Sequence, residues 1–74
     1  MAVARVTEIS STSPTSFDDA IQQGILRATK TLRNVRSAWV KEQQIKIDNG
    51  SIVEYQVNLM ITFVLDESNQ EEVA

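Results

Sequence analysis

The sequence predicts an α+β fold in which one helix packs on an antiparallel sheet, with the element order β-α-β-β. Three observations predict this fold. The chain opens with a run that alternates between β-branched and polar residues, and a segment with apolar residues at three- and four-residue spacing follows. Two further β-prone runs then flank the turn signal "DNGS".

The first strand is predicted from Ala2 to Ile9, where the alternation is regular. The stretch "SSTSPTS" that follows consists of small hydroxyl residues around Pro14, and this composition predicts a loop. Ser16 stands three residues before Asp19, which resembles a capping box with the shorter acid. We therefore expect a helix to begin directly after Ser16.

The helix is predicted to run from Phe17 to Arg33. A glycine inside a helix costs up to about 1 kcal/mol relative to alanine, so a compensating contact is expected at Gly24. We expect the helix backbone to approach the sheet closely there. The apolar residues form one stripe for packing on the sheet: Phe17, Ala20, Ile21, Gly24, Ala28 and Leu32.

The second half of the chain predicts a hairpin. Val35 to Ile47 forms one strand, Asp48 to Ser51 a tight turn because Asn-Gly tolerates positive φ, and Ile52 to Leu65 the last strand. Tyr55 is expected in the core with a solvated hydroxyl. The residues of the last strand that alternate onto the helix side are Val53, Tyr55, Val57, Leu59, Ile61, Phe63 and Leu65.

The predicted strands are too long for the helix to cover. A 14-residue strand spans roughly 45 Å, whereas a 17-residue helix spans only about 26 Å. The other face of the last strand carries Ile52, Met60 and Val64 among polar residues, and we expect Met60 and Thr62 at subunit contacts or inside an assembly. Because overhanging strands and a half-apolar face are unfavourable in a monomer, the sequence predicts a symmetric oligomer.

The composition excludes several function classes. A net charge of -3, with acidic residues at the C-terminal end, argues against a nucleic-acid partner. The chain has no histidine and no cysteine, which removes the commonest metal ligand, the usual neutral-pH base and the thiol nucleophile. Gly24 and Gly50 are isolated, so no glycine-rich phosphate loop is present. We predict that the protein is not an enzyme.

No apolar stretch approaches the roughly 20 residues of a membrane span, and the N-terminus lacks the pattern of a signal peptide. The sequence therefore predicts a cytoplasmic protein without a membrane partner. We place one domain at residues 1–67 and an acidic, disordered tail, "SNQEEVA", at residues 68–74.

Three segments resemble the dodecin family: "VTEISSTSPTSFDDAI", "RATKTLRNVRSAWVKEQ" and "DNGSIVEYQVNLMITFVLDE". The resemblance extends from Val3 to Glu67. It implies a protomer whose three-stranded antiparallel sheet wraps around one helix, and a hollow shell of twelve protomers. It also implies storage or sequestration of a flavin such as riboflavin, FMN or lumichrome, bound as stacked pairs at subunit interfaces.

The resemblance assigns site residues position by position. In flavin-binding dodecins a tryptophan on the second strand stacks on the isoalloxazine ring, and a glutamine on the third strand bonds to its polar edge. Gln56 in "EYQV" matches the glutamine. The stacking position, however, falls on Ser37 in "NVRSAWVKEQ", and Trp39 lies two residues further along. The two side chains share a face of the strand but stand roughly 6.6 Å apart along it.

Three interpretations of Trp39 follow. It is a displaced stacking platform, or it fills an interface or the pocket of a dodecin that binds little or no flavin. Alternatively, the pocket holds another flat or anionic ligand, with Arg36 and Lys41 as cationic partners. The predicted cofactor-binding residues are therefore Trp39, Gln56, Ser37 and Arg36. The alternative function is a structural shell that holds a cation or other small ligand at its interfaces.

Overall fold

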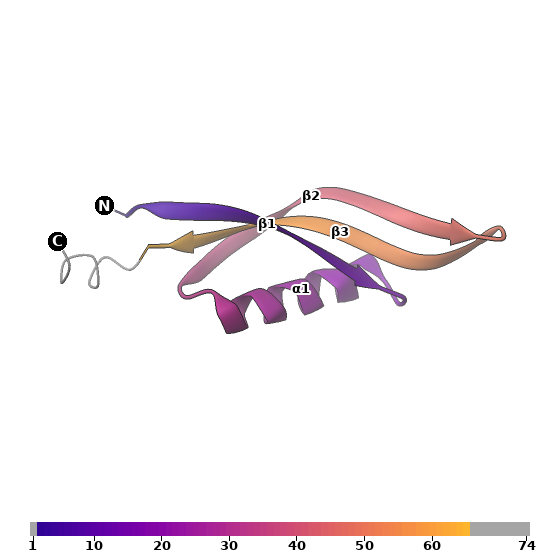
Figure 1. The fold of residues 1–74 in the computed structure, drawn as a ribbon, viewed down its shortest axis with the longest axis horizontal. Helices are drawn as coiled ribbons and strands as arrows, with labels where there is room; N and C mark the ends of the chain where they lie inside the picture. The colour runs from indigo at the N-terminus through magenta and orange to yellow at the C-terminus, as the bar shows by residue number, and fades with distance from the viewer. Residues whose placement is uncertain (1, 66–74) are drawn as a thin grey trace.

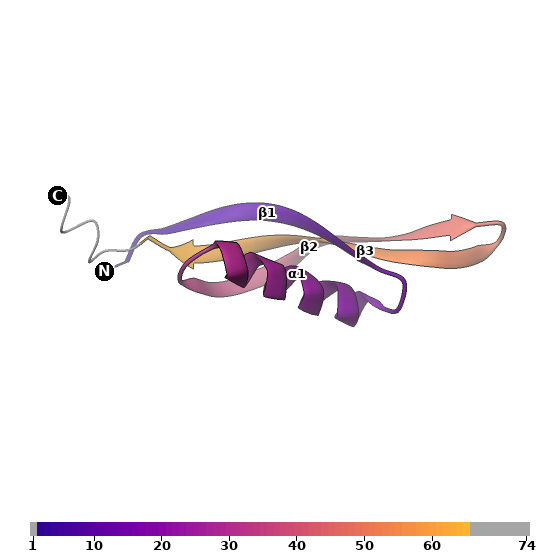
Figure 2. The same cartoon turned by 60° about the horizontal axis from the view of Figure 1, so that its bottom comes forward.

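A computed structural model describes residues 2–65 of the chain. In this part the elements follow the order β1 (Ala4–Ser13), α1 (Phe17–Thr31), β2 (Val35–Asp48) and β3 (Ser51–Val64). The three strands form one antiparallel sheet in the order β1-β3-β2, and α1 lies across one face of it (Figures 1 and 2). This arrangement confirms the predicted β-α-β-β fold. The predicted tail, residues 68–74, lies outside the described residues, and the domain limit at residue 67 stays a prediction.

The core lies between α1 and the central strand β3. Val57, Leu59 and Ile61 are fully buried there, and the helix presents Ala20 and Ala28 to them. The β3 residues alternate at a spacing of two, so all three point to the helix side of the sheet. The helix-facing pattern predicted for this strand is thereby confirmed at the centre of the sheet.

Gly24 lies where the helix comes closest to the sheet. A Cβ atom at this position would stand 3.0 Å from Cδ1 of Leu59 and 3.1 Å from Cβ of Ser11. Such distances are too short for an unstrained contact between carbon atoms. The predicted close approach at Gly24 is confirmed, and it accounts for a glycine inside the helix.

Tyr55 packs beside the start of the helix. Its ring meets that of Phe17 edge to face, with ring centroids 5.1 Å apart and an interplanar angle of 75°. This is a favourable geometry for two aromatic rings. Tyr55 is half-buried on the helix side, as expected.

The first strand is longer than predicted. β1 spans Ala4–Ser13, whereas the alternation placed the strand at Ala2 to Ile9 and a loop at "SSTSPTS". The loop prediction is wrong for residues 10–13, because pairing with β3 continues as far as Ser13, opposite Tyr55. The ladder supplies backbone partners that the hydroxyl-rich composition does not reveal.

The serine side chains on the helix side of β1 are hydrogen-bonded. Ser11 Oγ donates to the carbonyl of Ala20 at 2.7 Å. Ser13 Oγ donates to Asp19 Oδ2 at 2.6 Å and accepts from the N–H of Thr15 at 2.9 Å. Ser13 is only 1% exposed, so these bonds satisfy a buried polar group. They join the end of β1 to the start of α1.

The helix begins where the sequence predicts and ends two residues earlier. Ser16 is the N-cap, and its Oγ accepts from the N–H of Asp19 at 3.0 Å. At the other end, Leu32 has an extended backbone, and its N–H donates to the carbonyl of Ala28 at 2.8 Å. Asn34 follows with a φ of 62°, a left-handed conformation that turns the chain into β2. This turn stops the helix before Arg33.

The turn between β2 and β3 is the predicted one. Asn49 and Gly50 both have positive φ, 54° and 82°, which matches the two-residue turn that hairpins favour. Because β1 ends opposite Tyr55, the hairpin continues beyond it as two strands only. We call this extension, residues 45–54, the arm. It projects past the helix and the end of β1 (Figures 1 and 2).

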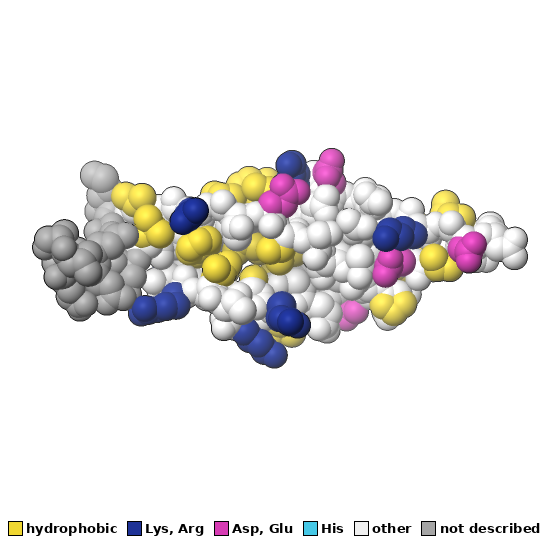
Figure 3. All heavy atoms as spheres, in the orientation of Figure 1, with side chains coloured by type: hydrophobic (Ala, Val, Ile, Leu, Met, Phe, Trp, Pro, Cys, Tyr) yellow, Lys and Arg dark blue, Asp and Glu magenta, His cyan; other side chains and the backbone are white. Residues whose placement is uncertain are grey.

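The arm makes the molecule long and leaves apolar side chains in solvent. The radius of gyration is 15.6 Å, whereas about 11 Å is expected for a compact domain of this length. Hydrophobic side chains are visible on the surface of the arm in Figure 3. Those of the arm that are 42–68% exposed are Ile45, Ile47, Ile52 and Val53.

Candidate functional site

The face of the sheet turned away from α1 carries most of the predicted site residues, and we call it the open face. Trp39 on β2 pairs with Met60 on β3, which pairs in turn with Glu8 on β1. Trp39 is 53% exposed, although it is the largest side chain of the protein. Within residues 2–65, about half of this side chain is open to solvent, so the indole is available for a contact.

Ser37 lies on the same face, at the next pair of residues away from the hairpin turn. It is exposed and pairs with Thr62. The register thus confirms that Ser37 and Trp39 share one side of β2. Trp39 stands roughly 6.6 Å closer to the arm, because two residues separate the two positions.

Gln56 also lies on the open face, but further toward the arm. It is half-buried and pairs with Gln44 on β2 and with Thr12 on β1. Four residues along β3 separate it from Met60, the partner of Trp39, which corresponds to about 13 Å. One chain therefore places the indole and the Gln56 amide on the same surface without bringing them into contact.

Arg36 does not lie beside Trp39 and Gln56. It lies at a bulge between Val35 and Ser37, where the register of β2 against β3 shifts, and it has no opposite residue on β3. Together with Ser37, it lines a small cavity of about 260 Å³ that includes Ile25 and Thr29 of the helix. The structure thus places Arg36 at the sheet edge beside α1, apart from Gln56.

A second bulge, between Val40 and Glu42, brings Lys41 and Glu42 onto the open face together. Lys41 Nζ forms an ion pair with Glu8 Oε1 at 3.2 Å. Its positive charge is therefore already matched by a carboxylate, which weakens the interpretation of Lys41 as a partner of an anionic ligand.

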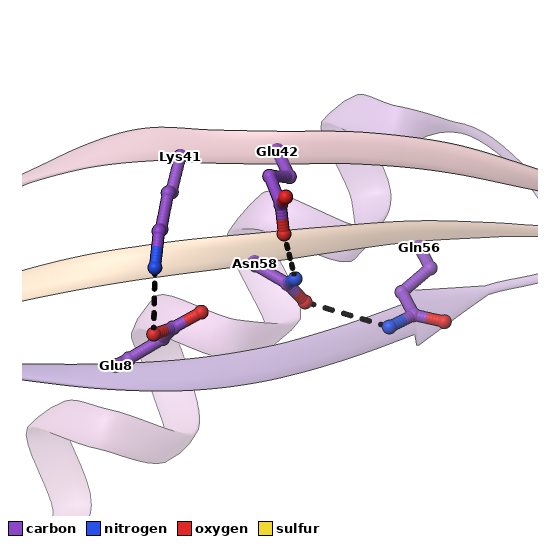
Figure 4. Close-up of polar contacts among 5 residues, drawn as sticks. All are labelled: Glu8, Lys41, Glu42, Gln56 and Asn58. Atoms are coloured by element: carbon purple, nitrogen blue, oxygen red, sulfur yellow. Dashed lines mark hydrogen bonds and ion pairs between the residues drawn. The ribbon is translucent and has the colours of Figure 1, made fainter.

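Glu42 belongs to a chain of hydrogen bonds that runs through Asn58 to Gln56 (Figure 4). Asn58 Nδ2 donates to Glu42 Oε1 at 2.8 Å, and Gln56 Nε2 donates to Asn58 Oδ1 at 3.4 Å. Gln56 Nε2 also donates to Ser10 Oγ at 2.9 Å. We call these four residues the amide network. It fixes a side chain that the resemblance assigns to ligand binding.

Sequence reasoning missed Glu42 and Asn58. Strict alternation from Trp39 puts Glu42 on the helix side of β2, and only the bulge returns it to the open face. The sequence around Lys41 contains no glycine or proline that marks a bulge. No signal in the chain itself would have found this contact.

A groove of about 640 Å³ lies on the other side of the molecule, between β1 and α1. Its wall includes Ile9, Leu26 and Leu32, with Arg27 and Lys30 on the helix. None of the predicted cofactor-binding residues lines it. The groove and the open face are thus two separate surfaces.

A metal-binding cluster and a membrane-spanning helix are both absent from residues 2–65. In that range no three histidine, cysteine, aspartate or glutamate side chains gather to hold a metal ion. The helix in the described part is neither long nor apolar enough to cross a membrane.

Known proteins resemble this chain over most of its length. The calcium dodecin of Mycobacterium tuberculosis is 33% identical over 63 residues, which cover 85% of this chain and 89% of the relative. The dodecin of Thermus thermophilus is 38% identical over 66 residues, 89% of this chain and 96% of the relative.

Solved structures agree with these relatives. The dodecin of Streptomyces davaonensis superposes with a TM-score of 0.84 at 40% identity, covering 88% of this chain and 96% of that one. The M. tuberculosis calcium dodecin, described as calcium-chelating with a novel calcium-binding site, gives a TM-score of 0.75 at 34% identity and covers 89% and 94%. The family model described as Dodecin matches residues 3–66. The fold, the relatives and this match together establish that the chain belongs to the dodecin family.

Proposed function

We propose that this chain is a flavin-binding and storage protein without catalytic activity, and that it works as a homo-oligomer, a hollow dodecamer. The ligand is a flavin such as riboflavin, FMN or lumichrome. The observation that carries the proposal is the 53% exposure of Trp39 on the open face of a dodecin fold. A flat indole held on a rigid strand is a suitable surface for a flat aromatic ring.

The assembly is supported by the surfaces that one chain leaves uncovered. The arm exposes Ile47 and Ile52 on a two-stranded ribbon, and a two-stranded ribbon is at best marginally stable alone. Exposed apolar patches of this kind are typical of contacts between proteins. Packing against further copies would cover the arm and extend the small core.

The position of the site between copies follows from the distance along the sheet. Trp39 and Gln56 stand about 13 Å apart in register on one chain, too far for a stacking contact and a hydrogen bond at the same ring edge. We infer that the stacking surface and the amide for one flavin come from different copies. Ser37 then lines the space beside the ring, and Arg36 lies at its margin.

Fluorescence titration of riboflavin tests the proposal. We expect wild-type protein to quench riboflavin fluorescence, and Trp39→Ala to bind about 5- to 150-fold more weakly, the usual worth of one stacking side chain. Val40→Ala is the matched control, because it truncates the next residue on the helix side of the same strand. Its affinity should equal that of the wild type.

Size-exclusion chromatography of the same samples separates the two parts of the proposal. If micromolar protein fails to quench, flavin binding is refuted while an assembly stands. If the wild type elutes as a stable monomer, the assembly is refuted. If Trp39→Ala weakens the assembly more than it weakens the affinity for riboflavin, the indole instead contributes to subunit packing.

A structural shell that holds a cation at its interfaces is the second candidate. The similarity to the calcium dodecin of M. tuberculosis favours it, as do the carboxylates of Glu8 and Glu42 on the open face. Calcium prefers several oxygen ligands, which two or more copies would have to supply. Calorimetric titration with calcium distinguishes the two functions, because the flavin site requires Trp39 and the cation site does not.

A further inference from the structure

We propose that Glu42 and Asn58 are positioning residues that orient the amide of Gln56 so that it offers an acceptor to the ligand. The site would then select flat ligands that carry an N–H donor on the ring edge. This inference rests on the proposed function and names the ligand chemistry of that site. It starts from the amide network of Glu42, Asn58, Gln56 and Ser10.

The carboxylate of Glu42 fixes the orientation of the Asn58 amide. An ionised carboxylate accepts hydrogen bonds and has no proton to donate. The group of Asn58 that lies 2.8 Å from Glu42 Oε1 must therefore be the donor, Nδ2. Charge-assisted bonds of this kind are among the stronger ones in proteins. The two ends of the Asn58 amide are thus distinguished by chemistry as well as by their placement.

The Asn58 amide in turn orients the amide of Gln56. With Nδ2 turned to Glu42, Asn58 presents Oδ1 on its other side, and Gln56 Nε2 lies 3.4 Å from it. Nε2 also donates to Ser10 Oγ at 2.9 Å. An amide nitrogen has two protons, and these two bonds use both.

The amide of Gln56 keeps its oxygen, Oε1, for a ligand. Its Oε1 points away from Asn58 in Figure 4. An acceptor held in this way matches an N–H donor, such as the imide N–H of an isoalloxazine or of lumichrome. A ring edge that brings only acceptors would face the lone pairs of Oε1 without a proton between them. Leaving such a group unsatisfied is unfavourable.

Side-chain amide exchange in the protein without ligand tests the orientation. By NMR, we expect the NH₂ protons of Gln56 to exchange with water several-fold more slowly than those of Gln44, which is exposed on the same sheet. In Asn58→Leu, which keeps the size and removes both polar atoms, the Gln56 exchange should rise toward the Gln44 rate, although the bond to Ser10 Oγ remains. Equal rates in the wild type, or no change in the variant, would overturn the inference.

A pair of flavins tests the selection. Lumiflavin and N3-methyllumiflavin lack a ribityl chain and differ in the imide proton. The wild type should bind lumiflavin about tenfold more tightly. In Asn58→Leu the freed amide can turn and donate, so we expect the ratio to fall to about threefold or less. Glu42→Gln should give an intermediate ratio, because a glutamine amide accepts or donates and no longer fixes Asn58.

Glu54→Gln is the matched control. It removes a carboxylate that lies on the open face of β3, two residues before Gln56. Glu54 forms an ion pair with Lys46 at 3.3 Å and is outside the amide network. Its binding ratio should equal that of the wild type. The inference fails if wild type does not discriminate, or if Asn58→Leu discriminates as strongly. If neither flavin binds, the proposed function fails, while the amide exchange still decides the orientation of Gln56.

Discussion

The two faces of the sheet differ in what a single chain can satisfy. On the helix side, Val57, Leu59 and Ile61 are at most 1% exposed, and the serine hydroxyls beside them have partners. On the open face, Trp39 is 53% exposed. The same sheet thus carries a buried core on the side of β3 that faces the helix and, on its other side, an exposed surface that includes Trp39 of β2.

The helix side therefore serves the folding of the protomer, whereas the open face is left for contacts with a ligand or another copy. The helix side is closed by one element of the same chain, so its stability belongs to the protomer. The open face has polar groups bonded among themselves and one large ring left free. Such a surface is unfavourable unless a ligand or another copy covers it. Substitutions on the two faces should therefore differ in kind as well as in size.

The largest expected effect is on the helix side. Leu59→Ala removes a side chain that is 1% exposed and leaves a cavity against the helix. We expect a loss of about 2–5 kcal/mol in the free energy of unfolding, a large part of the roughly 5–15 kcal/mol typical of a domain. Chemical denaturation followed by circular dichroism measures it.

Leu26→Ala is the control for that prediction. It makes the same chemical change at a helix position that is 57% exposed, so the loss should stay within about 0.5 kcal/mol. Equal losses at Leu59 and Leu26 would contradict the view that the buried side of the protomer carries the stability.

A smaller effect is expected at the helix–sheet contact. Gly24→Ala gains up to about 1 kcal/mol in helix propensity but crowds Leu59 and Ser11, and overpacking costs about 1–3 kcal/mol. Since Ser11 also bonds to the helix carbonyl of Ala20, it has little room to move. We expect a net loss of about 1 kcal/mol by thermal or chemical unfolding.

Gln23→Ala provides the comparison for Gly24→Ala. Gln23 is the residue directly before Gly24 in the helix, and it is exposed. The gain in helix propensity on substitution by alanine is therefore not opposed by a contact. This variant should be neutral or slightly stabilised. A stabilised Gly24→Ala would show that the sheet yields at this point.

The sequence predicted which residues of the last strand face the helix better than it predicted where the strands and the helix end. Period-2 spacing from Tyr55 to Phe63 is a local signal, and the helix confirms it by covering that side. The end of β1 was missed because Ser13 is held by pairing with a strand more than forty residues away. Hydroxyl-rich composition is the same for a loop and for a strand whose serines bond to a helix.

The open face was predicted in part. Alternation correctly put Ser37 and Trp39 on one side, and the last strand put Gln56 there too. The bulge that brings Glu42 beside Asn58 has no sequence signal, because it depends on how two long strands accommodate each other. How Trp39 and Gln56 meet a ligand depends on other copies of the chain and stays a prediction.

The smallest expected effect is on the open face itself. Glu8→Gln breaks the ion pair with Lys41, whose Nζ lies 3.2 Å from Glu8 Oε1, but both side chains are about half exposed, at 41% and 50%. Solvent screens such a pair, so we expect a loss within about 0.5 kcal/mol that shrinks further at high salt. Chemical unfolding at two salt concentrations measures it, with Glu54→Gln, which breaks the exposed pair with Lys46, as the control. A loss above about 2 kcal/mol confined to Glu8 would contradict the exposed state of this pair, because only a desolvated pair is worth that much.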